Sequence, residues 1–448
     1  MIQKTLNRIV KLKLLLFGYK VHSRSKNNQQ SNKLSIVYNV HNSMPETNNG
    51  YAMRTDTIAH AVQKENISIK VVTRAAFPMD FNFLKEYHND ILMYEIGGIE
   101  YHRLKKDALH IGKVNDIAYI NRYAYLLKKF SKNTNATIIH SASNYINGLA
   151  GVSAANSLGI PSIYEVRGFW EITRASREPA FKNSLAYKLQ KKLEIQACTE
   201  ATSVIALSEV VKEELINRGI EDEKIFVVPN GVDTDSLKPL PKESQTVETL
   251  KLKDKFVVGF IGSVVDYEGL SLLIQSAKAI EAVFPNMFRY LIVGDGNDLL
   301  NLQDLVKSLD IEHLFIFTGR VPYEEVENYY SVADIFCYPR LDWEVCRIVS
   351  PKKPFEAMAY GKPIVSSSVR ANSYFIEHEI NGLVHQKESV ESIVENIIKL
   401  YEDKELYHSI SQNAREWVVK YRDSKSTGKL LKKIYQHTQI IFYKGTHK

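Results

Sequence analysis

The chain has 448 residues, of which 44% are hydrophobic and 24% are charged, and its formal net charge is +7. This composition excludes collagen-like, low-complexity and disordered chains, and the length is sufficient for two domains with separate hydrophobic cores. The three cysteines, Cys198, Cys337 and Cys346, match no metal-ligand spacing, which argues against a zinc site and against a disulfide scaffold. No apolar run reaches the roughly 18 residues that a membrane-spanning helix needs.

Positive charge is concentrated at the two ends of the chain. Residues 1–33 contain eight Lys or Arg residues and no acidic residue, and residues 421–448 contain seven basic residues and one acidic residue. The region between them is therefore acidic. Because no nucleic-acid-binding motif accompanies the basic ends, we expect them to bind an anionic membrane surface rather than nucleic acid.

Residues 1–33 form a basic N-terminal extension. Apolar residues recur between its cations: Ile2, Leu6, Ile9, Val10, Leu14 and Phe17. This spacing predicts an amphipathic helix that lies at a membrane interface, and a solvated tail is the alternative. The polar stretch 22–33 predicts a flexible linker.

An alternation of buried strands and amphipathic helices begins at residue 34. The apolar run 34–40 predicts a buried parallel strand, and a polar loop separates it from a helix over 51–65. Further strands are predicted over 67–74, 91–95, 98–103, 136–140, 161–166, 203–208 and 224–229, and helices over 115–132, 145–158, 184–200 and 209–217. This pattern is typical of a doubly wound parallel sheet and predicts a first domain over 34–232.

A second alternation follows a stretch rich in charge and in Pro, residues 230–255, which we interpret as the connection between domains. Strands are predicted over 256–262, 290–294, 314–319, 334–339 and 363–368, and helices over 269–283, 298–309, 323–331, 373–378 and 388–443. The second domain is predicted over 256–420, and residues 421–448 are predicted to form a basic helix that packs on the first domain. The expected fold is α/β, with two Rossmann-like doubly wound domains facing a cleft.

The carboxyl ends of the second domain's strands carry the informative turns. Ligands of such sheets bind beyond these ends. The residues found there are Gly262, Ser263, Gly294, Gly296, Gly319, Arg320, Pro339 and Arg340. Glycines let a ligand approach the backbone, and the N-termini of the following helices attract phosphate. Together these turns predict a nucleotide-binding site.

The stretch 350–368 combines a basic turn, a short helix and a buried strand. Pro354 suits the first turn of a helix, and Gly361 suits its end. The Glu356 carboxylate can accept hydrogen bonds from a sugar diol, while Lys352 and Lys353 can meet a diphosphate. An ordinary strand-helix unit with a charged first turn is the alternative.

Taken in order, these residues resemble the retaining, GT-B-fold glycosyltransferases of family 4, also called group 1. The similarity covers roughly residues 34–422. Its motifs are NNGYAMR (48–54), HSASNYINGLAG (140–151), YEVRGFWE (164–171), ALSEVVKEEL (206–215), VVPNGVD (227–233), GFIGSVVDYEGL (259–270), VGDG (293–296), TGRVPYEEV (318–326), CYPR (337–340), PFEAMAYGKPIV (354–365) and INGLV (380–384).

The resemblance implies that the second domain holds a sugar nucleotide and the first domain holds an acceptor. Glu356 matches the glutamate that binds the ribose hydroxyls, and Val321 falls where backbone groups pair with the base. Asn49 and Gly50 fall on the loop that faces the diphosphate and the acceptor. The fold needs no metal or other cofactor, so the DxD of residues 233–235 is interpreted as a turn and helix cap.

The sequence departs from the family pattern at four positions. Ser263 and Glu268 stand where an Arg and a Lys usually neutralise the diphosphate. We therefore expect Arg340 and Lys353 to supply that charge as catalytic groups, although each is also compatible with a solvated surface cation. The two other departures are Ile348, where the family has a Glu, and Ala142, where a His commonly touches the donor sugar.

The first domain supplies the other candidate residues. His140 is expected to be catalytic, and a strand-end histidine that hydrogen-bonds the backbone is the alternative. The residues expected to bind an acceptor are Asn49, Gly50, Arg54, Glu165, Arg167, Trp170 and Glu171. Aromatic and charged groups together suit a carbohydrate, but a structural ion pair with a packed Trp would also explain the YEVRGFWE cluster.

The resemblance implies transfer of a sugar, with retention, from a nucleoside diphosphate sugar (UDP is the favoured base) to a glycan or lipid-linked acceptor. The expected setting is cell-envelope or capsular polysaccharide synthesis by a cytoplasmic protein bound peripherally to the inner face of the plasma membrane. Two alternatives are a non-catalytic partner subunit of a glycosyltransferase and a sugar-nucleotide epimerase or hydrolase. The sequence leaves the sugar, base, acceptor and linkage open.

Overall fold

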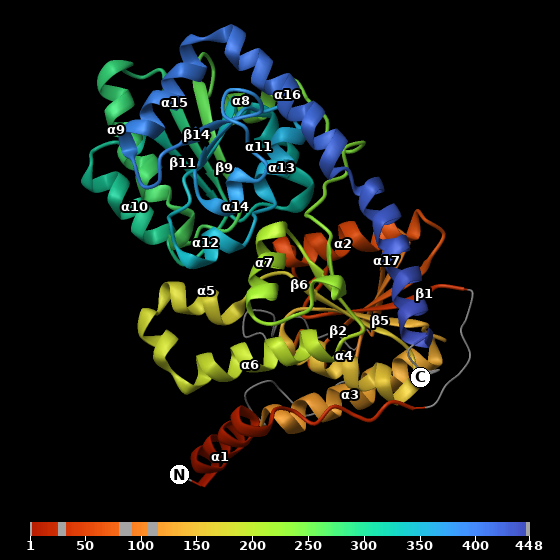
Figure 1. The fold of residues 1–448 in the computed structure, drawn as a ribbon. Coiled ribbons are helices and arrows are strands. Elements are labelled where there is room, and N and C mark those ends of the chain that lie inside the picture. Colours follow the sequence, from red (N-terminus) through yellow and green to blue (C-terminus); the bar gives the residue numbers. More distant parts are fainter. Residues whose placement is uncertain (1, 26–32, 80–91, 105–114, 445–448) are drawn as a thin grey trace. The chain divides into compact units, whose positions relative to one another are not determined.

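The computed structural model describes residues 2–25, 33–79, 92–104 and 115–444. Its contacts divide the chain into two compact units. The first unit contains Met1–Pro229 and Ser424–Lys448, and the second contains Asn230–Asp423 (Figure 1). The chain therefore passes between the units twice, at Pro229–Asn230 and at Asp423–Ser424.

The first unit is built on an eight-stranded sheet with the order β3-β4-β2-β1-β5-β6-β7-β8. The strands are β1 (Ser35–Val40), β2 (Ser68–Thr73), β3 (Met93–Ile96), β4 (Ile99–Arg103), β5 (Ile138–Ala142), β6 (Ser162–Val166), β7 (Ser203–Ala206) and β8 (Ile225–Val227). Among these described strands, β3 pairs antiparallel with β4, and the other pairs are parallel. The predicted doubly wound sheet is confirmed.

Helices cover both faces of this sheet, with α2 and α17 on one face and α3, α4 and α6 on the other (Figure 1). The helices of the first unit are α1 (Ile2–Phe17), α2 (Gly50–Gln63), α3 (Asp116–Asn133), α4 (Tyr145–Leu158), α5 (Trp170–Arg177), α6 (Leu185–Glu200), α7 (Glu209–Asn217) and α17 (Ser424–Lys444). Local signals explain several ends. Asn115, Asn144 and Ser184 accept hydrogen bonds from first-turn N–H groups, and Gly159 ends α4 in the left-handed region.

Helix α17 completes the core of the first unit, as the sequence predicted. Leu431, Ile434 and Tyr435 are buried in the same apolar cluster as residues of β1 and β2. A Cβ at Gly428 would lie 2.2 Å from the Ala61 carbonyl oxygen of α2. Only glycine therefore permits the close approach of these two helices.

The N-terminal extension packs on the first unit. The Tyr19 hydroxyl donates to Asn121 of α3 at 2.6 Å, and the Arg24 guanidinium lies 3.3 Å from the centroid of the Phe442 ring. The two ends of the chain thus meet at Arg24 and Phe442. The prediction of a flexible linker was wrong for residues 22–25, because His22 and Ser25 bond to residues of α4, and residues 26–32 lie outside the described residues.

The second unit is built on a six-stranded parallel sheet with the order β11-β10-β9-β12-β13-β14. Its strands are β9 (Phe256–Ile261), β10 (Phe288–Val293), β11 (Phe315–Gly319), β12 (Ile335–Tyr338), β13 (Ile364–Ser367) and β14 (Leu383–His385). Its helices are α8 (Ser244–Thr249), α9 (Leu270–Val283), α10 (Leu299–Ser308), α11 (Val326–Val332), α12 (Glu344–Ile348), α13 (Lys353–Ala359), α14 (Arg370–Ser373), α15 (Val390–Glu402) and α16 (Lys404–Arg422).

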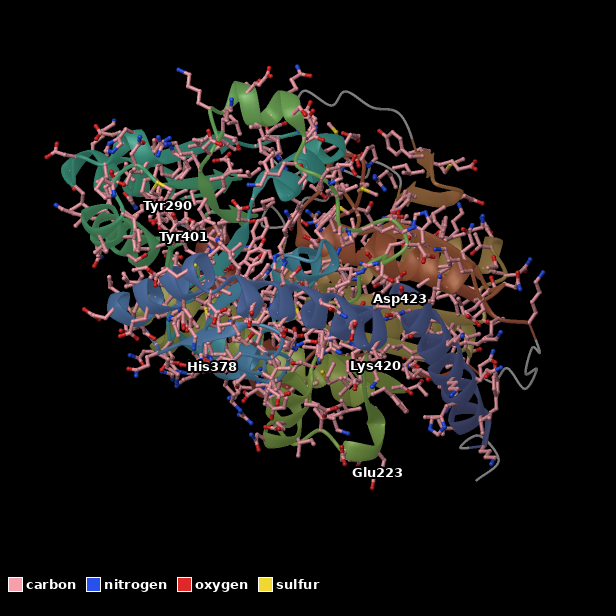
Figure 2. All side chains as sticks on the ribbon, turned by 90° about the horizontal axis from the view of Figure 1, so that it is seen from above. Glu223, Tyr290, His378, Tyr401, Lys420 and Asp423 are labelled. Atoms are coloured by element: carbon pink, nitrogen blue, oxygen red, sulfur yellow. The ribbon has the colours of Figure 1, made fainter. Side chains whose placement is uncertain are left out.

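Aromatic contacts attach α15 to this sheet. The Tyr401 ring lies 5.4 Å from that of Phe256 and 4.9 Å from that of Phe288, and Figure 2 labels Tyr401 together with Tyr290 of β10. Aromatic ring contacts of this kind add to the free energy gained by burying the rings. They help to fix the C-terminal helices of the second unit.

Two details of the second unit differ from the sequence prediction. The helix expected over 373–378 was wrong, since α14 ends at Ser373 and the following turn is bonded by Asn381, whose side chain accepts from the Glu377 N–H. The sequence analysis did not predict strand β14, which has three residues. Residues 230–255, expected to connect the domains, are packed within this unit, where Arg415 donates to the carbonyls of Thr234 and Leu237.

The two chain passages are joined within the second unit. The Val232 N–H donates to the Arg422 carbonyl at 2.9 Å, and the Thr234 hydroxyl bonds to Asp423. Asp423 is the last residue of the second unit (Figure 2). Both ends of the unit are thereby held next to each other.

Candidate active site

The glycine turns after β9 and β10 bring two loops into contact. The Gly262 N–H donates to the Val293 carbonyl, and the Val264 N–H donates to the Asp295 carbonyl. A Cβ at Gly294 would lie 1.9 Å from the Gly262 oxygen, and one at Gly296 would lie 1.9 Å from the Val264 oxygen. These glycines are therefore required by the contact between the loops, whereas the sequence analysis expected them to admit a ligand.

Lys353 crosses the first of these turns. A Cβ at Gly262 would lie 2.3 Å from Lys353 Cε, so the absence of a side chain lets the lysine stem pass over the backbone. The ammonium nitrogen lies 4.5 Å from the centroid of the Phe260 ring and 3.1 Å from Glu268 Oε1. The lysine is thus held at the carboxyl end of β9, where the sequence analysis placed the diphosphate.

Arg340 lies beside Lys353 and shares its carboxylate. The guanidinium is buried, donates to the Val349 carbonyl at 2.9 Å and places Nε 3.7 Å from Glu268 Oε2. Burial would raise the pKa of Glu268, but Lys353 and Arg340 outweigh it and lower that pKa. Both cations expected to bind a diphosphate therefore already face one ionised acid.

Glu356 is oriented from both sides. Its Oε2 accepts a hydrogen bond from the Tyr330 hydroxyl at 3.0 Å, and its Oε1 lies 3.2 Å from Lys352 Nζ. The carboxylate remains 24% exposed, so it can still accept hydrogen bonds from a ligand. Helix α13 carries Glu356 one turn after Lys352, which explains the pairing.

The other predicted donor residues lie on the surface of the same edge. Ser263 and Arg320 are exposed, and Val321 is half-buried next to Arg320. β9 and β10 pair directly in parallel, as do β10 and β11, so the turns that follow them emerge at the same edge of the sheet. The structure thus brings the predicted donor residues to one edge of the second unit.

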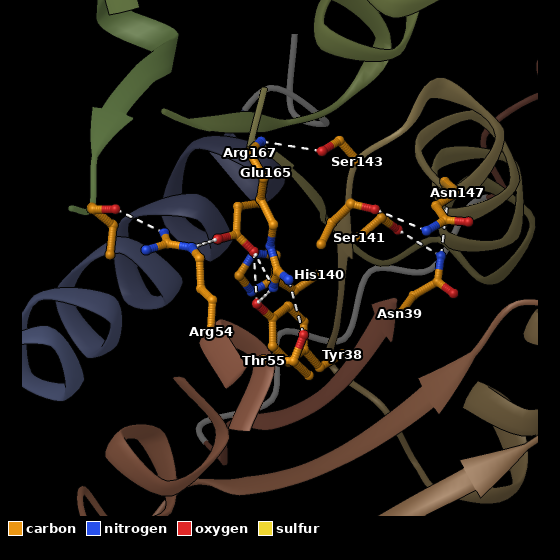
Figure 3. A network of polar contacts seen from close by, with 12 residues as sticks. Tyr38, Asn39, Arg54, Thr55, His140, Ser141, Ser143, Asn147, Glu165 and Arg167 are labelled. Atoms are coloured by element: carbon orange, nitrogen blue, oxygen red, sulfur yellow. Dashed lines mark hydrogen bonds and ion pairs between the residues drawn. The ribbon is translucent and has the colours of Figure 1, made fainter. Parts of the chain in front are cut away.

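Glu165 is the centre of a buried network in the first unit (Figure 3). It accepts hydrogen bonds from Tyr38 at 2.6 Å, from Arg54 at 2.6 Å and from Arg167 at 3.1 Å. Arg54 also donates to the carbonyls of Val228 and Pro229. Burial would raise the pKa of Glu165, but the two arginines outweigh it and hold that pKa far below its ordinary value.

This network corrects the acceptor prediction for Arg54, Glu165 and Arg167. Glu165 has no exposed surface, and the two arginines are almost as deeply buried. Their hydrogen bonds join α2, β6 and the end of β8. These residues form a structural ion-pair network, which was the alternative explanation for the YEVRGFWE cluster.

His140 is also buried, which corrects the catalytic role expected for it. Its Nδ1 lies 3.0 Å from the Tyr435 hydroxyl of α17, and its Nε2 lies 3.6 Å from Glu165 Oε2. Burial lowers the pKa of His140 to about 4. The ring is therefore neutral at pH 7 and has no exposed surface with which to touch a substrate.

Trp170 is the most exposed residue of the YEVRGFWE cluster, with 40% of its surface accessible. Its ring meets that of His41 edge-on at 4.8 Å. Glu171, by contrast, is buried in an ion pair with Arg218 at 2.7 Å, so its predicted contact with an acceptor is replaced by a structural one. Sequence reasoning missed His41, although its place directly after β1, at the carboxyl end of the sheet, was a usable signal.

Asn49 and Gly50 lie at the beginning of α2. The Asn49 side chain accepts from the Ala52 N–H and caps the helix, and a Cβ at Gly50 would meet nothing within 4 Å. Both residues are exposed. With Trp170 they form the accessible part of the acceptor set that the sequence predicted.

The DxD at residues 233–235 forms a turn, as predicted, but the predicted helix cap was wrong, since the next helix, α8, begins only at Ser244. Asp233 accepts from the N–H groups of Asp235 and Ser236. Among the described residues, no group of three or more His, Cys, Asp or Glu side chains is arranged to hold a metal ion.

The chain has two α/β units, each built on a largely parallel sheet, and the second unit has glycine turns at one edge of its sheet. This architecture is that of the GT-B fold. Two family models match the chain: Glycosyltransferase Family 4 over residues 48–236 and Glycosyl transferases group 1 over residues 241–417. The chain belongs to the group 1 glycosyltransferases with the GT-B fold.

Three curated relatives are similar over much of the chain. An uncharacterised glycosyltransferase of Methanocaldococcus jannaschii is 25% identical over 259 residues, which are 58% of this chain and 64% of the relative, so the chain spans slightly less than two thirds of that protein. UDP-Gal:alpha-D-GlcNAc-diphosphoundecaprenol alpha-1,3-galactosyltransferase of Escherichia coli is 27% identical over 65% of this chain and 73% of its own length. The capsular polysaccharide biosynthesis glycosyltransferase CapM of Staphylococcus aureus is 26% identical over 75% and 87%.

Two solved structures share the fold. Sucrose-phosphate synthase from Thermosynechococcus elongatus superposes with a TM-score of 0.73 at 15% identity, over 90% of this chain and 98% of that one. Anabaena HepE in complex with UDP superposes with a TM-score of 0.69 at 17% identity, over 90% and 100%.

Proposed function

We propose that this protein transfers a sugar from a nucleoside diphosphate sugar, with UDP as the favoured base, to a glycan or lipid-linked acceptor. The observation that carries the proposal is the arrangement of Lys353, Arg340 and Glu356 at one sheet edge of the second unit. The cations suit the diphosphate, and the partly exposed Glu356 carboxylate suits the ribose diol. UDP-galactose in the name of the E. coli relative and UDP in the HepE structure support the choice of base.

The chemistry that this arrangement supports is electrostatic. Lys353 and Arg340 would stabilise the negative charge that develops on the leaving diphosphate. The leaving diphosphate would take the proton of the acceptor hydroxyl, and the transition state would resemble an ion pair. We propose retention at the anomeric carbon by this route, with no cofactor other than the sugar nucleotide.

The first unit would supply the acceptor site through its exposed residues. Trp170 offers an aromatic face for a sugar ring, and Asn49 and Gly50 begin a helix whose N–H groups favour an anionic group. The relatives from E. coli and S. aureus are named for undecaprenol-linked and capsular polysaccharide synthesis. They support an acceptor of the cell envelope or capsule.

A membrane surface is the setting we propose, with the protein bound to the cytoplasmic face of the plasma membrane. In α1, Ile9, Leu12 and Leu16 recur at helical spacing and are exposed, and Phe17 is 79% exposed. Lysines lie between them in the sequence, and Lys192 of α6 donates to the carbonyls of Leu15 and Leu16 at the end of the helix. An apolar stripe with flanking cations suits an anionic bilayer. No helix within the described residues is long and apolar enough to cross one.

The first test is a thermal melt of the purified protein with UDP, GDP or ADP. A nucleotide at about a hundred times its Kd should add about 2.7 kcal/mol to the free energy of unfolding. A shift with UDP alone supports the proposed donor, and a shift with another base alone corrects that base. No shift with any nucleotide contradicts the proposed donor site.

One observation favours a second candidate, a non-catalytic partner subunit of a glycosyltransferase. Glu268 already pairs with Arg340 and Lys353, and in a partner subunit these ion pairs would be structural and would bind no diphosphate. Turnover or slow hydrolysis of UDP-sugars by the purified protein alone would exclude this candidate. A sugar-nucleotide hydrolase would instead release the free sugar and the nucleoside diphosphate as its main reaction without any acceptor, and an epimerase would convert the sugar into its epimer.

A further inference from the structure

A buried carboxylate lies between the two cations of the proposed donor site. Glu268 Oε1 is 3.1 Å from Lys353 Nζ, and Glu268 Oε2 is 3.7 Å from Arg340 Nε. The Glu268 side chain is only 6% exposed. Within the described part of the chain, Glu268 Oε2 and Arg340 Nε form no hydrogen bond, so these two groups interact through charge alone.

The backbone fixes the position of this carboxylate. Glu268 ends a short 3₁₀ turn, and the following Gly269 has φ 72°. A Cβ at Gly269 would lie 2.4 Å from the Pro339 carbonyl oxygen, and the Leu341 N–H donates to the Tyr267 carbonyl. The turn is therefore attached to the segment that carries Arg340, on both sides of that residue.

We propose that Glu268 is a positioning residue of the donor site, whose carboxylate holds the Lys353 ammonium over Gly262 in its charged form so that Lys353 and Arg340 can together meet an anionic diphosphate. This inference rests on the proposed function. The inference goes beyond that function because it assigns Glu268, which stands where the family has a lysine, the role of positioning Lys353. Lys353 Nζ lies 3.1 Å from Glu268 Oε1 and 3.5 Å from the Ser263 carbonyl oxygen, and the Lys353 side chain is 18% exposed, so the ammonium can still donate to a ligand.

The electrostatics of Lys353 support this role. Burial lowers the pKa of Lys353, and the neighbouring Arg340 lowers it further. Glu268 is the strongest opposing influence, and Glu356, which is itself paired with Lys352, opposes more weakly. Without Glu268, the Lys353 and Arg340 cations would lie close together with little negative charge beside them. The lysine would then lose its proton at a lower pH.

The experiment is calorimetric titration of UDP into the wild-type protein and the variant Glu268→Gln at pH 7 and pH 9. We expect the wild-type affinity to change less than threefold between the two pH values. Glu268→Gln should bind UDP at least tenfold more weakly than the wild type at pH 7, and its affinity for UDP should fall further at pH 9. In the double variant Glu268→Gln with Lys353→Arg, that further loss should vanish, because arginine stays charged at both pH values.

A matched control and a graded variant accompany these measurements. Glu312→Gln removes an exposed acid of the same unit and should leave UDP binding unchanged. Glu268→Asp retains the charge but is shorter by one methylene group, so it should give an intermediate affinity. If Glu268→Gln binds UDP as tightly as the wild type or more tightly at both pH values, the acid competes with the ligand and the proposal is overturned.

A second readout needs no nucleotide and separates this inference from the proposed function. Lysines labelled with ¹³C at Cε are titrated by NMR, and the signal of Lys353 is assigned from its loss in Lys353→Arg. Glu268→Gln should lower the titration midpoint of Lys353 by at least about one pH unit. An unchanged midpoint overturns the inference even if UDP binds. A lowered midpoint without UDP binding supports the electrostatic coupling and contradicts the donor site.

Discussion

The Tyr435 hydroxyl lies 3.0 Å from Nδ1 of His140, although 295 residues separate them in the sequence. This contact joins α17 to the middle of β5, inside the first unit. It explains why a histidine at the place of a catalytic residue is instead part of the core. It also makes the C-terminal helix a structural requirement of the first unit.

Tyr435→Phe should therefore destabilise the first unit. The substitution leaves His140 Nδ1 buried without its hydrogen-bond partner, which costs about 1–3 kcal/mol. Urea unfolding followed by circular dichroism measures the change. Tyr421→Phe, at a tyrosine that is 48% exposed, is the control and should have no effect. Equal stability of Tyr435→Phe and the wild type would show that the contact contributes nothing.

The buried histidine predicts a pH dependence of stability. Burial lowers the pKa of His140 from 6.5 to about 4 in the folded protein. Because the unfolded chain binds the proton more readily, this contribution to stability is present above pH 6.5 and is lost as the pH falls towards 4. Between pH 7 and pH 4.5, His140→Asn should lose less stability than the wild type. His408→Asn, at an exposed position, should lose as much as the wild type, and equal losses for all three proteins would contradict the assignment.

Glu356 and Lys353 should both affect nucleotide binding, but only Lys353 should strongly affect kcat. Glu356→Ala should weaken nucleotide binding by about 10- to 100-fold, because hydrogen bonds to a charged group are worth about 1.5–3 kcal/mol. Lys353→Ala should also weaken UDP binding and, in addition, should lower kcat, because its charge stabilises the leaving diphosphate. Calorimetry with UDP measures the first effect, and steady-state kinetics with a UDP-sugar measures the second. If both parameters are unchanged in both variants, the donor site lies elsewhere.

Gly294→Ala should destabilise the second unit and weaken nucleotide binding. The new Cβ would lie 1.9 Å from the Gly262 carbonyl oxygen, and φ at this position is 139°. The loops that carry Gly262 and Gly294 must then separate, which moves the backbone beneath Lys353. Gly50→Ala, whose Cβ would meet nothing within 4 Å, is the matched control for thermal stability. A melting temperature for Gly294→Ala equal to that of the control would show that the loops tolerate separation.

Vesicle binding should depend on both charge and the exposed residues of α1. Flotation with anionic vesicles should recover more protein at low salt than at high salt, because salt screens the basic residues. Replacing Leu16 and Phe17 by serine should weaken binding by about tenfold per residue, since each large apolar side chain gains about 1.5–3 kcal/mol on burial. Leu300→Ser, at an exposed leucine of the second unit, is the control. Equal recovery with neutral vesicles would argue against an anionic bilayer as the partner.

The sequence by itself determined the alternation of strands and helices, because burial on both faces of a parallel sheet produces apolar runs such as 34–40 and 256–262. It also placed the glycine turns at one edge of the second sheet, because the carboxyl ends of parallel strands lie there, and it placed Lys353 and Glu356 in a basic turn and a short helix. Caps such as Asn144 and Ser184 made several helix boundaries readable from local chemistry.

Only the tertiary structure decided which polar residues are accessible. Glu165, Arg167 and His140 follow or end strands in the sequence as catalytic residues do, yet the packing of α17 over β5 buries His140. Likewise, the pairing of Glu268 with Lys353 joins side chains that are far apart in the sequence. Burial and charge pairing depend on such distant contacts, and local patterns carry no information about them. Glu165, Arg167 and His140 were therefore predicted to belong to the active site, but in the first unit they are structural residues.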